Sequence, residues 1–589
     1  MLAAPLAAQT TGAPAVRELL RPASQSELAP VLERYTTDRA VLLRRYDTEW
    51  APDRRERLRA FYQDWQQQLA AADFDALGVE GRIDHVLLSN RLRYELALLD
   101  RETTQLDEMR GLLPFAEVAM ELQRSRRRLE KVDAPAVARR LTAIAQQVDS
   151  VRRAVEASLR PDSGSRRARP AAIVAYRSMN TLADLRRTLD AWYRYYAGYD
   201  PQFTWWVAEP WKRADSTMNA YHRLLRERVL GYRAGEEEPI IADPIGAAGL
   251  AADLRHEMLP YDPDQLIQIA EREFAWCDAE MRKAAKAMGF DDWKQALEKV
   301  KGAYVPPGEQ PELARFLANE AVEFVESHDL VTVPALAKEV WRMEMMSPER
   351  QRVAPFFLGG EVLLVAFPTD AMSHEDKLMS LRGNNRHFSR AVVHHELIPG
   401  HHLQGFMAQR YNAHRRPFGT PFLTEGWALW WEMLLWDLDF PRSPEDRVGM
   451  LFWRMHRAAR IIFSLKVHQG QMTPPEAIDF LVDRVGHERA NATAEVRRSF
   501  NGTYPPLYQV AYMMGGLQLR ALHTELVASG KMSNREFHDR ILRAGSMPIE
   551  LIRASLTGTQ LERDHVASWK FAGELRPAPV QAGDRRSPR

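Results

Sequence analysis

The chain has 589 residues, with 80 Lys and Arg against 79 Asp and Glu and a hydrophobic content of 45%. It lacks both the basic excess of proteins that neutralise nucleic-acid phosphates and the apolar-poor composition of disordered chains, so we expect a folded protein with no nucleic-acid partner. The single cysteine, Cys277, excludes an internal disulfide and a cysteine-based zinc or iron–sulfur cluster.

The N-terminal sequence MLAAPLAAQTTGAPAV allows two interpretations. It resembles the end of a secretory signal, with small residues before a cleavage point near Ala8, but the charged start and most of the apolar segment are missing. The protein is then either exported (periplasmic or secreted) with a truncated signal, or cytoplasmic with a disordered leader over residues 1–15. No stretch reaches the roughly 18 consecutive apolar residues of a membrane span, so we expect none.

Helical periodicity dominates the first half of the chain. The segment RIDHVLLSNRLRYELALLDRE repeats apolar residues at spacings of mostly three and four, which predicts an amphipathic helix. Similar segments predict an N-terminal helical half over about residues 16–230. Turn residues then surround a short β-branched run at 233–249, where we expect a linker or small strand. A helix follows, with Asp262 as its N-cap and Gly289 as its stop.

The catalytic half, about residues 231–570, contains one change of pattern. Between 330 and 369, VTVPAL and FFLGGEVLLVAFP lack a helical period and predict a small sheet. Helices return over 389–438, 446–469, 474–485 and 508–553. We therefore predict a mainly α fold in a single large domain, residues 16–570, followed by a disordered tail at 571–589 that has few apolar residues to bury.

The densest chemical signal is the segment AVVHHELIPGHHLQ. In zinc hydrolases, a His followed by Glu, with a second His four residues after the first, places both imidazoles on one helical face while the Glu reaches the metal-bound water. Here His395 and Glu396 fit, but Pro399 occupies the fourth position. Pro399 must kink or bulge the helix, which can bring His401 to the place of the second ligand. His402 is the alternative ligand.

A third ligand is expected from the segment TEGWALWWEML. Thr424 is a candidate N-cap, and Glu425 in the first turn is the better metal ligand. Glu432, two turns further on the same face, is expected to accept the free N–H of a ligand histidine. The alternative is that these histidines only satisfy backbone groups in a tight turn.

These segments resemble the bacterial family catalogued as domain of unknown function 885, through the pattern HExxPGHxxQ and the downstream EGWA. More distantly they resemble gluzincin metallopeptidases of the thimet oligopeptidase and angiotensin-converting-enzyme type. Similar segments run from about residue 20 to 565, among them RAARIIFSLKVHQGQMTPPEAI and YQVAYMMGGLQLRAL. The resemblance implies a multi-helix hydrolase with a small sheet near the active site and a cleft or channel. It also implies Zn²⁺ held by His395, His401 and Glu425, with Glu396 as the base.

Further site residues lie downstream. A tetrahedral oxyanion needs a hydrogen-bond donor, for which Tyr512 is favoured on resemblance and Tyr508 and His468 are the other candidates. Arg457 and Arg460 are expected to bind a substrate carboxylate, unless they form structural ion pairs. Gln509 matches the family pattern beside Tyr508. These residues complete the predicted substrate-binding set.

The function expected from these residues is zinc-dependent hydrolysis of amide bonds in short peptides, with a glutamate as general base. Two alternatives remain open: a metal hydrolase of non-peptide amides or esters, and a non-catalytic helical binding protein whose site has decayed. The expected partner is a short peptide or small amide, and the chain is expected to act as a monomer or homodimer.

Overall fold

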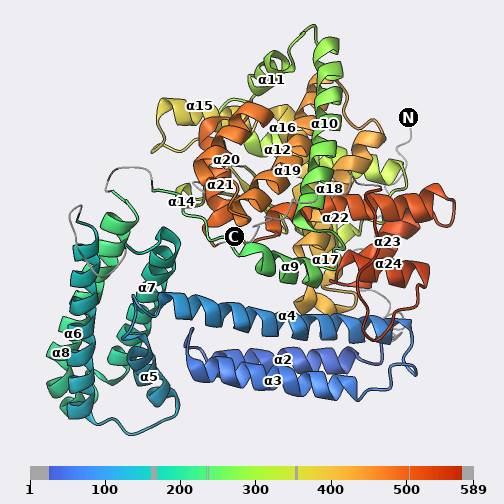
Figure 1. Cartoon of the computed structure of the whole chain (residues 1–589). Helices are drawn as coiled ribbons and strands as arrows, with labels where there is room; N and C mark the ends of the chain where they lie inside the picture. Colours follow the sequence, from blue (N-terminus) through green and yellow to red (C-terminus); the bar gives the residue numbers. More distant parts are fainter. Residues whose placement is uncertain are drawn as a thin grey trace, which may run out of the picture. The chain divides into compact units, whose positions relative to one another are not determined.

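The computed structural model describes residues 26–160, 169–233, 235, 238–351, 354, 356–502 and 504–573. The predicted leader, and the predicted tail from residue 574 onward, lie outside the described residues. Helices dominate, which confirms the mainly α prediction (Figure 1).

The helices up to the first strand are α2 (Ala29–Arg45), α3 (Pro52–Ala70), α4 (Val79–Met109), α5 (Ala116–Arg127), α6 (Ala134–Ser158), α7 (Ala172–Tyr196), α8 (Pro201–Arg223), α9 (Gly246–His256), α10 (Pro263–Ala287), α11 (Trp293–Lys301), α12 (Gln310–Ser327) and α13 (Ala335–Val340). A short helix α14 (Pro348–Gln351) lies between strands β1 (Arg342–Met345) and β2 (Val362–Val365). The later helices are α15 (His374–Gly383), α16 (Arg386–Glu396), α17 (His401–Ala408), α18 (Pro421–Asp437), α19 (Pro444–His468), α20 (Pro474–Phe480), α21 (Arg489–Phe500), α22 (Tyr508–His523), α23 (Asn534–Ala544) and α24 (Ile549–Thr557).

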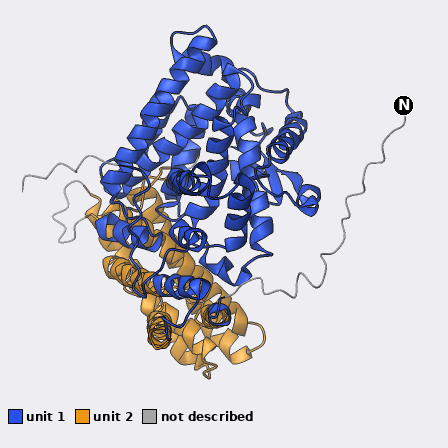
Figure 2. Cartoon of the chain, turned by 90° about the vertical axis from the view of Figure 1, so that its right-hand side faces the viewer, with its two compact units in different colours: residues 1–32, 73–91, 244–589 blue, residues 33–72, 92–243 orange. Residues whose placement is uncertain are grey.

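The chain forms two compact units (Figure 2). One comprises residues 33–72 and 92–243 and has its own apolar core, in which α6 packs on α8 and α5 on α7. The other comprises residues 1–32, 73–91 and 244–589 and contains every predicted site residue. Among the described residues, no helix is long and apolar enough to cross a membrane.

The predicted sheet is present but smaller than expected. Strands β1 and β2 pair in parallel with Arg342 opposite Val362, and Leu358 adds one antiparallel bridge to Leu364. The segment VTVPAL was predicted to contribute a strand, and this is wrong, because helix α13 begins there with Pro334 as its N-cap. Proline has no N–H to donate to a strand ladder, but it is well tolerated at a helix start.

The centre of the site-bearing unit is built from α16, α18, α19 and α22. Helices α18 and α22 lie side by side (Figure 1), so close that a Cβ on Gly515 would overlap the carbonyl of Phe422. A glycine also faces Gly515 from α18, at Gly426. This close approach brings the segment that begins at Tyr508 next to the glutamates of α18.

Of three predicted helix boundaries, the structure bears out two and corrects one. Asp262 caps α10 through a reciprocal pair of hydrogen bonds with Gln265, and Gly289 follows the helix at φ +86°, as predicted. For α18 the predicted N-cap, Thr424, is wrong. Thr420 caps the helix by accepting the Phe422 N–H, and Pro421 occupies the first helical position, where its fixed φ favours initiation.

Candidate metal centre

Two short helices, rather than one kinked helix, present the histidines. Helix α16 ends at Glu396, where Leu397 adopts φ −106° and ψ −107°, and α17 begins at His401. Pro399 lies in the connecting turn, after a cis peptide bond. Because proline cannot continue the helical hydrogen-bond ladder, the two metal-binding candidates are carried by separate elements.

The turn is held against α16 and α18. The Gly400 amide donates to the His394 carbonyl at 3.0 Å, and a Cβ on Gly400 would overlap the carbonyl of His395. From α18, the Trp427 indole N–H donates to the Pro399 carbonyl at 2.8 Å. Glycine is therefore required where the turn folds back onto α16.

Four side chains converge at this point. The Nε2 atoms of His395 and His401 lie 3.5 and 3.2 Å from Glu425 Oε2, and Glu396 Oε2 lies 4.0 Å from His401 Nε2. One ligand atom from each of His395, Glu396 and His401 can be chosen so that all lie within 4.8 Å of one another. The structure thus brings together the histidine and glutamate side chains singled out in the sequence.

Glu425 Oε2 is buried and accepts no hydrogen bond from the described residues. Burial alone raises the pKa of a carboxyl group, but His401 and His395 hold the pKa of Glu425 well below its usual range. A buried, ionised oxygen that faces two imidazole nitrogens has the chemistry of a metal ligand.

Glu432 orients the first histidine. Its Oε1 lies 2.7 Å from His395 Nδ1, and Arg457 Nη2 lies 3.4 Å from the same oxygen. Burial lowers the pKa of His395, but Glu425 and Glu432 outweigh it and raise this pKa to about 9. The two carboxylates, one near each ring nitrogen, therefore favour the protonated form of His395.

Tyr508 orients the glutamate. Its hydroxyl donates to Glu425 Oε1, which leaves Oε2 directed at the two histidines. Burial, with Tyr512 and Glu425 nearby, raises the pKa of Tyr508, so the hydroxyl keeps the proton that it donates. The hydroxyl of Tyr508, which was predicted to bind substrate or an oxyanion, therefore donates its hydrogen to Glu425.

We expect Tyr508→Phe to weaken zinc binding by about 10- to 100-fold, because partners that orient a ligand carry effects of this size. Competition with a chromogenic chelator measures the affinity. Tyr504→Phe is the matched control, since the centroid of the Tyr504 ring lies 4.2 Å from that of Tyr508 and no hydrogen bond joins Tyr504 to Glu425 in the described part of the chain. Equal zinc affinities in the two variants contradict the orienting role.

Tyr512 lies beside the histidine cluster. Its ring is 6.1 Å from that of His395 and nearly parallel to it, and the guanidinium groups of Arg457 and Arg460 each lie 4.5 Å from its centroid. Burial, followed by Glu425, raises the pKa of Tyr512 to about 12. Its hydroxyl makes no hydrogen bond within the described residues, so this neutral group has a proton to donate.

The other predicted residues have the following surroundings. Arg460 Nε donates to Glu495 at 2.7 Å, Gln509 Nε2 donates to Ser499 at 2.7 Å, and His402 Nε2 lies 2.7 Å from the Ala337 carbonyl. His468 ends α19, eleven residues after Arg457, which corresponds to roughly 16 Å along the helix. The contact of His402 with Ala337 favours His401 over His402 as a ligand. The distance along α19 separates His468 from the cluster.

Two buried charged residues of α21 were not among the site residues predicted from the sequence. Glu495 is fully buried and accepts the hydrogen bond from Arg460, and Arg498 Nη1 lies 3.8 Å from its other oxygen. Burial raises and the two arginines lower the pKa of Glu495, with the net result at about 2. The i,i+3 spacing of Glu495 and Arg498 in a helical segment was the signal that could have revealed this pair.

A comparison with known protein families agrees with the resemblance seen in the sequence. The model of the family described as "Bacterial protein of unknown function (DUF885)" matches residues 39–556. No curated protein matches the chain.

Two solved structures share the fold. The first, described as a "putative lipoprotein of unknown function" from Shewanella oneidensis, has a TM-score of 0.66 and 18% identity, over 90% of this chain and 100% of that one. The second, a "putative lipoprotein" from Colwellia psychrerythraea, has a TM-score of 0.56 and 17% identity, over 90% and 98% of the two chains. Since the family model covers most of its length, the chain belongs to the DUF885 family.

Proposed function

We propose that this protein is a zinc-dependent hydrolase that cleaves amide bonds in short peptides. The observation that carries the proposal is the position of Glu425 Oε2, which is buried without a hydrogen bond from the described residues and lies 3.5 and 3.2 Å from the Nε2 atoms of His395 and His401. Two imidazoles and one carboxylate are a common ligand set of catalytic zinc.

The surrounding groups support this assignment. Glu432 fixes the far nitrogen of His395, and Tyr508 fixes the far oxygen of Glu425, which are the orienting contacts that zinc ligands normally have. His401, His395 and Glu425 are the residues that would hold the metal. When bound, zinc would supply Lewis acidity, which lowers the pKa of water and polarises a carbonyl group.

Glu396 is the proposed general base. Its side chain is 11% exposed and that of His401 is 14% exposed, against 2% for His395 and 6% for Glu425, so the cluster is most accessible to water at Glu396 and His401. A carboxylate there accepts a proton from the attacking water and returns it to the leaving amine nitrogen. Glu396 also lies close enough to His395 and His401 to act as a ligand itself, an alternative that the glutamine variant below distinguishes.

Tyr512 is the proposed donor to the oxyanion that develops on the substrate carbonyl. Its proton is retained at neutral pH, because its pKa is raised to about 12, and its hydroxyl has no acceptor among the described residues. Of the two predicted carboxylate-binding arginines, Arg460 is held by Glu495 at 2.7 Å. Among the described residues, the ion pair of Arg457 is the longer one, 3.4 Å to Glu432, so Arg457 is the better candidate for a substrate carboxylate.

An exported location is part of the proposal. Two proteins of the same fold each carry the description "putative lipoprotein", and the Ala-rich N-terminal sequence is compatible with the end of a secretory signal.

The test is hydrolysis of a library of short peptides before and after removal of metal. We expect activity to disappear on dialysis against a chelator and to return when zinc is added. A parallel set of non-peptide amides and esters separates peptidases from other metal hydrolases. Hydrolysis that survives metal removal contradicts the proposal.

A further inference from the structure

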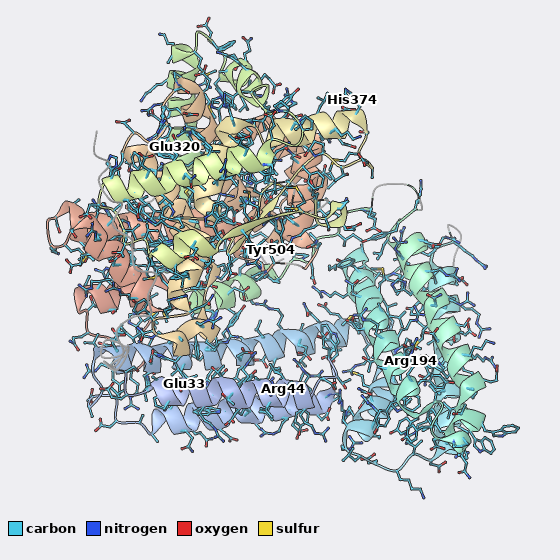
Figure 3. All side chains as sticks on the ribbon, turned by 180° about the vertical axis from the view of Figure 1, so that it is seen from behind. Glu33, Arg44, Arg194, Glu320, His374 and Tyr504 are labelled. Atoms are coloured by element: carbon cyan, nitrogen blue, oxygen red, sulfur yellow. The ribbon has the colours of Figure 1, made fainter. Side chains whose placement is uncertain are left out.

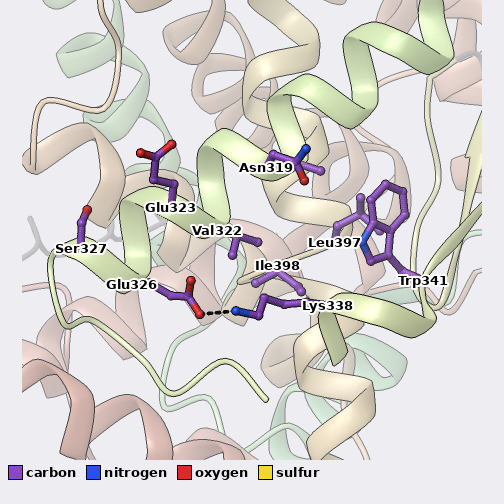
Figure 4. A pocket seen from close by; sticks show the side chains of 10 residues that line it. Asn319, Val322, Glu323, Glu326, Ser327, Lys338, Trp341, Leu397 and Ile398 are labelled. Carbon is purple, nitrogen blue, oxygen red and sulfur yellow. Dashed lines mark hydrogen bonds and ion pairs between the residues drawn. The ribbon is translucent and has the colours of Figure 1, made fainter. Parts of the chain in front are cut away.

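A cavity of about 380 Å³ adjoins the turn that follows Glu396, and Leu397 and Ile398 of this turn line it (Figure 4). Its walls come from α12 and α13, and its remaining side is formed by Leu397, Ile398 and Trp341. This volume falls within the usual range of small-ligand pockets, near its lower end.

The cavity is separate from the candidate metal centre but adjoins it along the chain. None of His395, Glu396, His401 and Glu425 is among the described residues that line it. Leu397 and Ile398, however, occupy the turn between Glu396 and His401. A ligand in the cavity therefore contacts the segment that sets the positions of the proposed base and the second histidine.

The lining combines an apolar surface with three charged side chains, Glu323, Glu326 and Lys338. Val322, Trp341, Leu397 and Ile398 provide the apolar contacts. Lys338 and Glu326 form an ion pair at one side of the cavity (Figure 4). Their Nζ and Oε1 atoms lie 2.8 Å apart. Their side chains are 29% and 42% exposed, and an exposed pair of this kind contributes little to stability, so a ligand that carries both charges can replace it at small cost.

We propose that this cavity binds a free α-amino acid with an apolar side chain. The ammonium and carboxylate groups of such a molecule share one carbon atom, so both can reach the Lys338–Glu326 pair. Its carboxylate binds Lys338, its ammonium group binds Glu326, and its side chain packs on Trp341, Leu397 and Ile398. Binding immobilises the turn between Glu396 and His401. The site does not depend on the proposed hydrolase activity.

Calorimetric titration of the full-length protein with L-leucine tests the site. We expect saturable binding by L-leucine. L-Leucinamide lacks the carboxylate and 4-methylpentanoate lacks the ammonium group, so each is expected to bind at least about tenfold more weakly, because each leaves one charged partner unmatched. Absence of saturable leucine binding, or equal binding of all three compounds, overturns the proposal.

Variants locate the bound amino acid. Lys338→Met and Val322→Trp are expected to abolish leucine binding, the first by removing a charge and the second by filling the cavity. Lys299→Gln is the control, since Lys299 pairs with Glu445 at 3.0 Å and does not line the cavity. A cooperative thermal unfolding transition shows that each variant is folded. If Val322→Trp does not fold, Lys338→Met alone tests the location of the bound amino acid.

The metal centre is tested separately with Glu425→Gln. Leucine binding is expected to persist in this variant. Binding that is lost in Glu425→Gln and retained in Lys338→Met places the amino acid at the metal centre and overturns the proposal. Because no step of the titration involves peptide hydrolysis, loss of the proposed enzymatic activity leaves this test unaffected.

Discussion

Glu396→Gln is expected to lower peptide hydrolysis by about 100- to 10,000-fold, the range typical for removal of a general base. The glutamine amide has nearly the same shape as the carboxylate but cannot accept the water proton at neutral pH. Because His395, His401 and Glu425 remain, the zinc content is expected to stay unchanged. Initial rates on a peptide substrate and elemental analysis of the same preparation measure the two effects.

The matched control for Glu396→Gln is Glu375→Gln. His374 and Glu375 form the same dipeptide at the exposed start of α15, and Figure 3 shows His374 at the edge of the molecule. Full activity in Glu396→Gln contradicts its role as the base. Loss of zinc together with activity shows that Glu396 is a ligand instead.

Gly400→Ala is expected to disrupt the metal centre through the backbone. A Cβ at this position overlaps the carbonyls of His395 and His394, so α17 must move away from α16 and take His401 with it. Overpacking of this kind typically costs about 1–3 kcal/mol of stability. We expect zinc affinity to fall by about 100-fold, comparable to the loss of an orienting contact. Denaturant unfolding and chelator competition provide the measurements.

Gly405→Ala is the control in the same segment. No heavy atom lies within 4 Å of a Cβ built on Gly405 in helix α17, and alanine in a helix is favoured over glycine by roughly 0.5–1 kcal/mol. This variant is expected to be as stable as the wild type or more so, with unchanged zinc affinity. A Gly400→Ala protein that behaves like Gly405→Ala contradicts the close packing of the turn.

Local patterns in the sequence predicted much of the helical structure. The capping residue Asp262 and the stop at Gly289 followed from side-chain and backbone preferences that act within a few residues. The start of α18 was misplaced because Thr420 and Thr424 are both acceptable caps. The choice depends on Pro421, whose fixed φ favours the earlier start.

The candidate site was predictable in its residue types but not in its contacts. Pro399 indicated a break in the helix, yet the separation into α16 and α17 depends on Trp427 and on the close packing of Gly400, which only the tertiary structure brings together. The hydrogen bond from Tyr508 to Glu425 joins residues that are 83 positions apart in the sequence, and it follows from the close approach of α22 to α18. No local pattern encodes such a contact.

The metal content of the wild-type protein tests the central claim most directly. The protein is purified without added metal or chelator, analysed for elements, and analysed again after zinc addition and dialysis. The account predicts about one zinc ion per chain, and none in a Glu425→Gln protein treated in the same way, since a catalytic zinc site needs three protein ligands. A wild-type protein that holds no metal after zinc addition contradicts the account, and its histidines and glutamates then form a structural polar cluster.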